Sequence, residues 1–374
     1  MKKLITIFFV CTANVLFAQQ IDSTLNLKDI EIPTSPGFIL LDQAPSSIER
    51  PNSPKAFAVS ALNSFTESNG LPKNYAVEFT PFWFFKHPNM NVLKYAGYNE
   101  KKQRPFSSLK MVSLSMAYIN QTDSLSLSPV NNISIGARTN LFKIRSKDNL
   151  KAISDANSAS VSYLKKINDL IVDRIGPANP LDPDGYKKKQ LELLLFFQDS
   201  LKDDISAAHS KLSDAIIQKP VFAIDFAIAY NTFFTDNDFS TQQFGRFGTW
   251  LTLNYSQKLN KDNSNYINIY AIGRYLQDGT NKDNIGEFVT QDFYDFGGKI
   301  ELELNKFSLG YEYIYRSNNS VETYRSSGQL KYRIADNILL TGAFGKNFGD
   351  NNNLISMIGI NWGISTGNEK ARIE

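Results

Sequence analysis

Between residues 220 and 364 the chain alternates apolar and polar residues in stretches of about 10 to 15 residues, separated by short turns rich in Asn, Asp, Gly and Lys. In 221–234 the bulky apolar residues share one parity: Phe222, Ile224, Phe226, Ile228, Tyr230 and Phe234. The opposite parity is small or polar. A strand of this kind is long enough to cross a bilayer when tilted, with lipid on its apolar face and a lumen on the other. The pattern predicts a transmembrane β-barrel.

The alternation defines strands at 74–85, 109–120, 132–142, 221–234, 246–257, 266–276, 291–304, 306–316, 321–334, 338–348 and 354–364. Soluble β-sandwiches also alternate, but their strands are typically about five or six residues long and expose the polar face to bulk water. Here the polar face is rich in Gly, Ala and Ser, and the other face is crowded with aromatic residues, which favours a barrel. Bacterial barrels have even strand numbers, so a twelfth strand within residues 20–73 would complete an antiparallel barrel of about 12 strands.

Residues 20–73 have a different composition from the strands and form an N-terminal Pro-rich segment. Five prolines, Pro33, Pro36, Pro45, Pro51 and Pro54, separate its short apolar pieces. Within it, residues 55–65 place their apolar side chains on one helical face, which predicts a short amphipathic helix that begins after Ser53-Pro54. Two interpretations are open: a loosely ordered periplasmic arm, or a segment that packs in the barrel lumen as a plug.

An α-helical hairpin interrupts the strands between 142 and 221. Residues 148–175 and 186–219 each carry apolar residues at helical spacing, and a Pro- and Gly-rich stretch joins them at 176–185. Each helix has one apolar stripe, so the two are expected to pack as an antiparallel pair that serves as a spacer or as a docking surface. Short connections at 305–306, 335–337 and 261–264 mark one end of the barrel as periplasmic, because bacterial barrels keep their long loops outside. Strand parity then predicts a periplasmic hairpin.

The first residues have the pattern of a secretory signal peptide. Basic Met1-Lys2-Lys3 precedes an apolar run from Leu4 to Phe17, and the small residue Ala18 supplies a cleavage site after residue 18 or 19. The run of about 14 residues is shorter than the roughly 20 that a spanning helix needs. Cys11, the only cysteine, lies inside this run, so the mature chain has no disulfide and no thiolate ligand.

These boundaries divide the chain into a signal peptide (1–19), an N-terminal arm or lumen plug (20–73), a first set of barrel strands (74–146), the helical hairpin (147–219), a second set of barrel strands (220–364) and a C-terminal tail (365–374).

Charged residues on the lumen-facing parity are the candidate functional residues. They are Glu78, Arg138, Asp225, Arg246, Arg274, Asp295, Lys299, Glu301, Glu303, Glu312, Arg316, Arg325, Lys331 and Arg333. Both signs occur, which indicates internal ion pairs or a polar wall rather than a selectivity ring of one sign. We expect no catalysis, because neither His87 nor His209 lies where it could serve as a base on the barrel wall.

Composition excludes further classes. Lys and Arg number 40 against 37 Asp and Glu, so no basic field for nucleic acid is present. Asp182-Pro183-Asp184-Gly185 begins like a calcium loop but lacks the later ligands, and no glycine-rich dinucleotide motif occurs. We therefore predict no metal and no cofactor. The aromatic content of 13% is enough for the two aromatic girdles of a membrane barrel.

Three pieces, at 33–38, 48–54 and 76–83, resemble the opening of a group of uncharacterised outer-membrane barrel proteins from diderm bacteria. The resemblance implies Sec export, insertion into outer-membrane lipid by the barrel-assembly machinery, and this fold; it implies no activity. Two functions are open. The protein is a channel or small-solute transporter with a partly plugged polar lumen, or it is a structural anchor whose helical hairpin docks a partner protein.

Overall fold

The computed structural model describes residues 24–26, 35–42, 44, 56–61, 74–99, 102–106, 112–122, 129–176, 183–235, 238–260, 265–318, 321–335, 337–349, 353–364 and 370–373. The predicted signal peptide lies outside these residues, and so does the 48–54 piece of the family resemblance.

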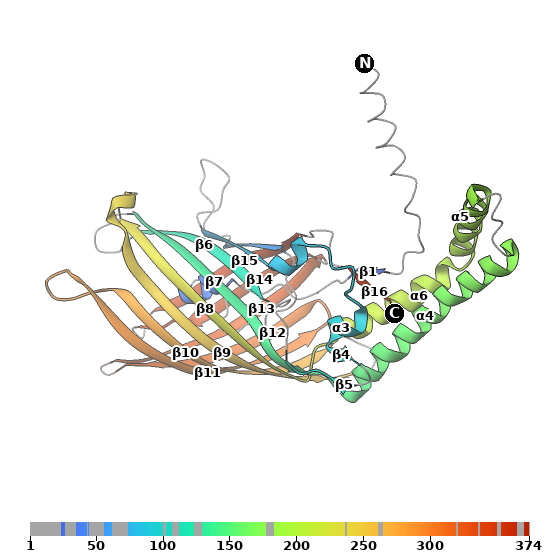
Figure 1. The fold of residues 1–374 in the computed structure, drawn as a ribbon. Helices are drawn as coiled ribbons and strands as arrows, with labels where there is room; N and C mark the ends of the chain where they lie inside the picture. Colours follow the sequence, from blue (N-terminus) through green and yellow to red (C-terminus); the bar gives the residue numbers. More distant parts are fainter. Residues whose placement is uncertain are drawn as a thin grey trace, which may run out of the picture.

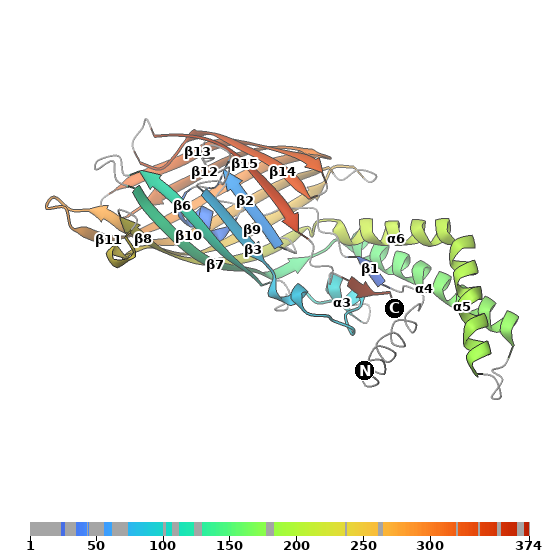
Figure 2. The same cartoon turned by 90° about the horizontal axis from the view of Figure 1, so that it is seen from above.

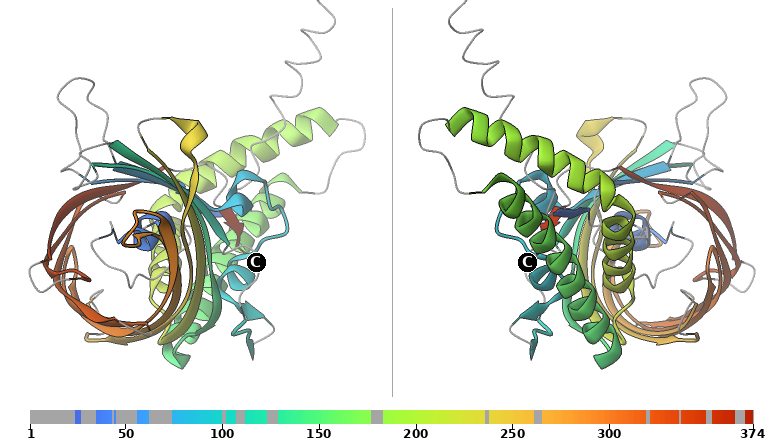
Figure 3. Two further views of the ribbon diagram at one scale, coloured as in Figure 1. Left: turned by 90° about the vertical axis from the view of Figure 1, so that its left-hand side faces the viewer. Right: turned by 90° about the vertical axis from the view of Figure 1, so that its right-hand side faces the viewer.

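Twelve strands in the described part of the chain form one closed antiparallel barrel (Figures 1 and 3). They are β2 (Ala56–Ala61), β3 (Asn74–Phe79), β6 (Ser113–Thr122), β7 (Pro129–Ile144), β8 (Phe222–Thr235), β9 (Gln243–Lys258), β10 (Tyr266–Lys282), β11 (Phe288–Leu304), β12 (Phe307–Ser317), β13 (Glu322–Ala335), β14 (Ile338–Lys346) and β15 (Leu354–Ile364). Strand β2 closes the ring between β15 and β3. Because the ring is closed, the backbone N–H and C=O groups on both edges of each strand have a neighbouring strand to pair with. A sheet in lipid requires this, since no water is there to bond them. The predicted fold class is confirmed.

The two faces of the wall differ as the alternation predicts. On β11, Tyr294, Phe296 and Ile300 are exposed on the outer face, and Ile300 is 61% exposed. Between them, Asp295 and Lys299 are buried inside the barrel. An apolar outer face and a polar inner face are the arrangement of a barrel that stands in a bilayer.

Residues 56–61 correct one prediction of local structure. The amphipathic helix expected over 55–65 is absent there, and strand β2 occupies this position. Phe57, Ala58 and Ala61 are spaced for one helical face, whereas Phe57, Val59 and Ala61 alternate as in a strand. The edges of β15 and β3, which both pair with this segment, decide between the two patterns. This is the twelfth strand that the even-number rule required.

The first predicted strand, 74–85, is shorter than expected. Strand β3 ends at Phe79, and Pro81, which has no backbone N–H to donate to a ladder, begins the 3₁₀ helix η2 (Pro81–Phe84). Trp83 has the parity of Tyr75, Val77 and Phe79 and would face lipid if the strand ran to residue 85, but it is instead buried in an apolar core beside the end of the barrel, at 1% exposure.

A small platform lies at the end of the barrel where η2 leaves the wall. Strand β1 (Thr24–Asn26) pairs with β16 (Lys370–Arg372) beside helix α3 (Val92–Ala96) and the short pair β4 (Tyr98–Asn99) and β5 (Lys102–Gln103). The apolar core of the platform comprises Leu25, Trp83, Val92, Tyr95, Ala96, Ala371 and Ile373, together with Ile153, Leu212, Ala215 and Ile216 of the hairpin. The platform therefore joins both chain ends to the base of the hairpin.

The hairpin contains three helices where two were predicted: α4 (Lys147–Ile175), α5 (Pro183–Ser200) and α6 (Lys202–Ile217). The second arm bends at Leu201, whose φ and ψ are −108° and 12°, and α5 turns away from α6 (Figure 1). Helix α4 alone is about 44 Å long at 1.5 Å per residue. Arg145 fixes the base by donating to the carbonyls of Gln218 at 2.6 Å and Ile216 at 3.0 Å.

The hairpin and the platform lie at the same end of the barrel as the tight β9–β10, β11–β12 and β13–β14 connections (Figures 1 and 2). We call this the hairpin end and the opposite end the loop end; the 3₁₀ helix η4 (Phe239–Thr241) lies in a connection at the loop end. The assignment of the hairpin end to the periplasm stays a prediction from loop lengths. Within the described residues, no helix is both long and apolar enough to cross a membrane.

A cation on the outer face should destabilise the barrel. Ile228 lies near the middle of β8 with its side chain on the lipid side, so Ile228→Arg is expected to cost about 2–4 kcal/mol. Urea unfolding in liposomes, followed by heat-modifiable gel migration, measures this cost. The control is Ile285→Arg in the β10–β11 connection, where the side chain is already exposed. Equal unfolding midpoints for the two variants would contradict the assigned faces.

Candidate functional site: a segment inside the lumen and its arginine cluster

The short helix α2 (Pro36–Leu40) lies inside the barrel (Figure 3). We call residues 35–42 and Ala44 the lumenal segment. Pro36 occupies the first helical turn, where its missing N–H costs nothing. Helix α2 contacts β6, β7, β8 and β9, and all of its residues are buried. This segment is the only part of the Pro-rich region that the structure describes within the lumen.

Glycines let the lumenal segment approach the wall closely. A Cβ atom on Gly37 would lie 2.8 Å from the Cβ of Ala117, and one on Gly136 would lie 2.8 Å from the Cβ of Pro36. On the far side of α2, a Cβ on Gly248 would lie 2.7 Å from Cδ1 of Leu40. In a close-packed interior, a Cβ at position 37 or 136 would therefore force the segment away from the wall, and one at position 248 would force the Leu40 side chain to move. The small residues of the inner parity therefore form a seat shaped for this segment.

An apolar cluster fills the middle of the lumen. Phe38, Ile39, Leu40 and Leu41 pack against inner-wall residues that include Ala117, Ala227, Ala229, Trp250, Ile272, Leu276 and Ile314. Sequence reasoning predicted a polar wall and missed these residues as part of the site. Two signals pointed to them: the isolated apolar run 38–41 in a Pro-rich segment, and Trp250 on the otherwise small or polar parity of β9.

Four arginines of the wall converge on the C-terminal part of the lumenal segment. Arg246 donates to the carbonyl of Leu40 at 3.2 Å, Arg274 to that of Ile39 at 3.3 Å, and Arg325 to that of Ala44 at 2.8 Å. We call Arg246, Arg274, Arg316 and Arg325 the arginine cluster. They come from β9, β10, β12 and β13 and lie toward the loop end of the barrel.

Asp42 is the only charged residue that the lumenal segment brings to this cluster. Its carboxylate lies 3.1 Å from Arg246, 3.5 Å from Arg274 and 3.6 Å from Arg316. Its backbone φ is +55°, in the left-handed region that Asp tolerates better than most residues. This conformation turns the chain directly after α2 and directs the carboxylate into the cluster.

The arginine cluster also pairs with carboxylates of the wall. Arg246 pairs with Asp278 at 2.8 Å, and Arg325 with Glu312 at 3.3 Å. Arg274 and Arg316 share Asp295, at 2.5 Å and 2.9 Å. Among the described residues, the four guanidinium groups thus meet three wall carboxylates, and Asp42 supplies a fourth carboxylate from the lumenal segment.

The remaining predicted lumen residues form separate groups nearer the hairpin end. Arg138 and Glu78 pair at 2.5 Å, with Ser113 donating to the same carboxylate. Asp225 accepts from Asn140 at 2.7 Å and from Asn254.

A further cluster of opposite charges joins the wall to the hairpin. Glu301 pairs with Lys299 at 2.9 Å and with Lys331 at 3.3 Å, while Glu303 pairs with Lys219, which directly precedes β8. Arg333 lies apart from these groups, near the β13–β14 turn. All fourteen predicted residues are buried or half-buried, and the two signs alternate around the lumen.

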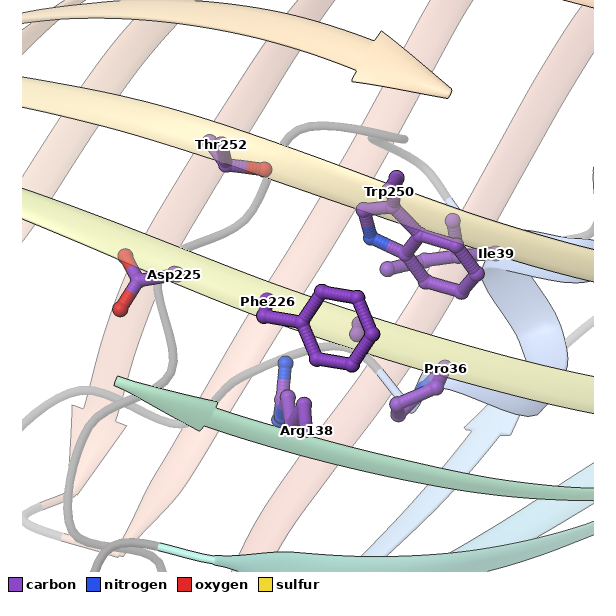
Figure 4. A pocket seen from close by; sticks show the side chains of 8 residues that line it. Pro36, Ile39, Arg138, Asp225, Phe226, Trp250 and Thr252 are labelled. Atoms are coloured by element: carbon purple, nitrogen blue, oxygen red, sulfur yellow. The ribbon is translucent and has the colours of Figure 1, made fainter. Parts of the chain in front are cut away.

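A small cavity separates α2 from the wall at β7, β8 and β9 (Figure 4). It is lined by Pro36, Ile39, Arg138, Asp225, Phe226, Ala227, Trp250 and Thr252. The cavity is small, so the lumenal segment lies close to the wall at these residues.

The structure offers little support for other chemistry. Among the described residues, no group of three His, Cys, Asp or Glu side chains could hold a metal ion. His87 stacks on Phe82 with ring centroids 3.5 Å apart and bonds to the Phe82 carbonyl at 2.7 Å, outside the lumen. His209 lies on α6 of the hairpin.

No protein-family model matches the chain, and no curated protein matches it. Among solved structures it is similar to the NanC porin, at 10% identity and a TM-score of 0.31, over 83% of this chain and 97% of that one. It is also similar to the KdgM porin in complex with disordered oligogalacturonate, at 10% identity and a TM-score of 0.35, over 78% and 92% of the two chains. The outer membrane protein Omp33 of Acinetobacter baumannii matches at 9% identity and a TM-score of 0.30, over 85% and 96%.

The fold of this chain rests on its own closed strand register, not on those likenesses. That register, the apolar outer face and the polar inner face define a transmembrane antiparallel β-barrel with a segment of its own chain inside the lumen.

Removal of a shared carboxylate should weaken the arginine cluster. Asp295→Asn leaves Arg274 and Arg316 without their closest partner in a buried site, so it is expected to cost about 3–5 kcal/mol of unfolding free energy. Asp292→Asn on the same strand is the matched control, because Asp292 is exposed and accepts only from Tyr275 at 2.8 Å. Urea midpoints compare the variants, and no difference between them would contradict the role of the buried pairs.

Proposed function

We propose that the protein is an outer-membrane channel for small solutes whose lumen is partly closed by its lumenal segment. The observation that carries this proposal is the position of residues 35–42 and Ala44 inside a twelve-stranded barrel, held there by hydrogen bonds, ion pairs and apolar contacts. Export by the Sec route and insertion by the barrel-assembly machinery belong to the same proposal.

The width of the barrel supports a channel. A barrel of about 8 strands is just filled by the side chains of its own wall, whereas porins of about 16 strands leave an aqueous channel. Twelve strands lie between these limits. The inner wall here carries Gly, Ala and Ser beside apolar residues such as Trp250 and Ile272 where α2 is seated, so displacement of α2 would leave an open space between small, apolar and charged side chains. A barrel with a purely structural role does not need an internal segment that can move from its seat in the wall.

The connections of the lumenal segment also support a gate. On its N-terminal side the chain passes from β1, whose Leu25 is buried in the platform, and on its C-terminal side it continues into the wall as β2. The N-terminal side of the segment is therefore connected to the platform at the hairpin end, and its C-terminal side is connected to the barrel strand β2. A partial shift within the lumen can open a path without loss of the segment from the barrel.

A cysteine pair tests the channel directly. In the variant Gly37→Cys/Ser134→Cys, built on Ala117→Gly to remove the Cβ that would lie 2.8 Å from the new one, the Cβ of residue 37 would lie 3.3 Å from that of residue 134, slightly closer than in a relaxed disulfide. Cross-linking should fix α2 against β7. In planar bilayers we expect openings to fall at least tenfold after oxidation and to return on reduction.

Each single cysteine variant is the control and should respond to neither treatment. Because Cys11 precedes the predicted cleavage site, the mature background contains no other thiol. Full conductance in the oxidised double variant, with the cross-link confirmed by mass spectrometry, would refute a gating role for the segment.

The hairpin gives specific support to a second function, an anchor for a partner protein. Its distal half exposes Val172 of α4 together with Leu195 and Phe196 of α5, and Phe196 is 58% exposed. Large apolar side chains that gather on an extended arm are typical of a contact surface. The base of the hairpin has a different role, because Ile153 and Leu212 belong to the platform core.

Excision of the distal hairpin separates the two functions. Replacement of residues 165–201 by a short Gly/Ser bridge removes α5 and leaves α6 and the platform contacts intact. The barrel should still fold and conduct, since its strand register does not involve the arm. Complete excision of 148–219 should destabilise the platform as well. Loss of conductance after the distal excision alone would assign the arm to transport.

A further inference from the structure

Three arginines of the cluster each contact both a wall carboxylate and Asp42. The wall contacts are 2.5–2.9 Å long: Arg274 and Arg316 with Asp295, and Arg246 with Asp278. Contacts from the same three arginines to Asp42 are longer, at 3.1, 3.5 and 3.6 Å. Charge-assisted hydrogen bonds between N⁺–H and O⁻ are strongest near 2.7–2.9 Å. Each of these three arginines is therefore held mainly by its wall carboxylate and can keep its position when Asp42 leaves.

Within the part of the chain that the structure describes, Asp42 is also the only carboxylate of the cluster that is not part of the wall. If the lumenal segment shifts, Arg246, Arg274 and Arg316 lose this partner, and the cluster loses one negative charge. An unbalanced buried charge is costly, because the lumen wall screens it far less than water does. Binding of one anion where the Asp42 carboxylate had been would restore the lost negative charge and is therefore favourable.

The donors around Asp42 suit a carboxylate in particular. Arg246 and Arg274 each present one nitrogen to the Asp42 carboxylate and another contact to a neighbouring carbonyl of the segment, on Leu40 and Ile39. Guanidinium groups offer several fixed N–H donors and match the planar geometry of carboxylates. Arg316 is held in place by stacking on Phe348, 3.6 Å from the ring centroid, so the donors are positioned before a ligand arrives.

We infer that the arginine cluster is a binding site for the carboxylate of a small anionic solute, and that Asp42 occupies this site in the closed lumen. The inference rests on the proposed channel function and names its substrate class. A solute that enters from the loop end meets the cluster before it meets the charged groups near the hairpin end. Its carboxylate replaces that of Asp42, and the lumenal segment is released by this exchange. Because ligand and segment compete for one site, binding shifts the population toward the open lumen.

Acetate is the simplest probe of this exchange, and Asp42→Asn is the decisive variant. Asn tolerates the left-handed backbone and keeps the side-chain shape, so the substitution removes only the charge. Titration calorimetry on the folded barrel in detergent should give acetate binding about tenfold tighter for Asp42→Asn than for the wild type, because the competing carboxylate is gone. Acetamide, which is neutral and of similar size, should bind neither protein.

The disulfide variant gives a second readout that does not depend on conductance. Potassium acetate should slow cross-linking of Gly37→Cys/Ser134→Cys several-fold relative to potassium chloride at equal ionic strength, since acetate displaces the segment. Addition of Arg246→Gln should abolish this difference, because it removes the guanidinium nearest to Asp42. Addition of Lys331→Gln, near Glu301 in the other cluster, should preserve it. Heat-modifiable migration verifies that each variant is folded.

The outcomes separate this inference from the proposed function. Equal acetate affinity for wild type and Asp42→Asn, or an equal effect of chloride and acetate on cross-linking, would overturn the carboxylate site even if the protein conducts. Acetate binding that depends on Arg246 and is strengthened by Asp42→Asn would establish the site even if no conductance is found, and in that case the channel proposal would fail alone.

Discussion

The need to pair every backbone N–H and C=O within lipid determines the rest of this structure. An antiparallel sheet meets that need only when its edges join, and here the six-residue strand β2 completes the ring between β15 and β3. Closure at twelve strands leaves an interior wider than the wall side chains can fill. The lumenal segment occupies this interior, and the glycines at positions 37, 136 and 248 allow it to fit. The wall closure and the internal segment are thus two consequences of one constraint.

The charges of the lumen follow the same division between wall and segment. Near the hairpin end, carboxylates and cations pair within the wall or with the hairpin, as Glu78 does with Arg138 and Glu303 with Lys219. Toward the loop end, among the described residues, four arginines pair with three wall carboxylates and with Asp42 of the lumenal segment. The Asp42 carboxylate belongs to a separate segment and can be exchanged for the carboxylate of a solute, whereas the carboxylates of the wall are fixed in their strands. The contact that can be exchanged therefore lies in the half of the barrel nearer the loop end.

The platform connects the lumenal segment to the hairpin. Leu25 of β1 packs with Ile153 and Leu212 of the hairpin base, and β1 itself pairs with β16 near the C-terminus. The part of the chain that leads to the lumenal segment is therefore anchored in the same apolar core that supports the hairpin. A partner bound to the distal hairpin would act on the core that holds this tether, so the anchor and the channel functions are physically compatible.

The sequence by itself determined the barrel, its strand positions, the inner and outer faces and the helical insertion, because alternation with a period of two and helical spacing are local properties. It also placed charged residues such as Arg274 and Asp295 on the lumen side. Tertiary structure decided what local pattern leaves ambiguous: residues 56–61 became a strand because two open edges needed a partner, and Trp83 was buried because Pro81 ended β3. Only the three-dimensional fold brought Asp42 to the arginines more than 200 residues away, because a contact between a segment and a wall depends on how the ring closes around it.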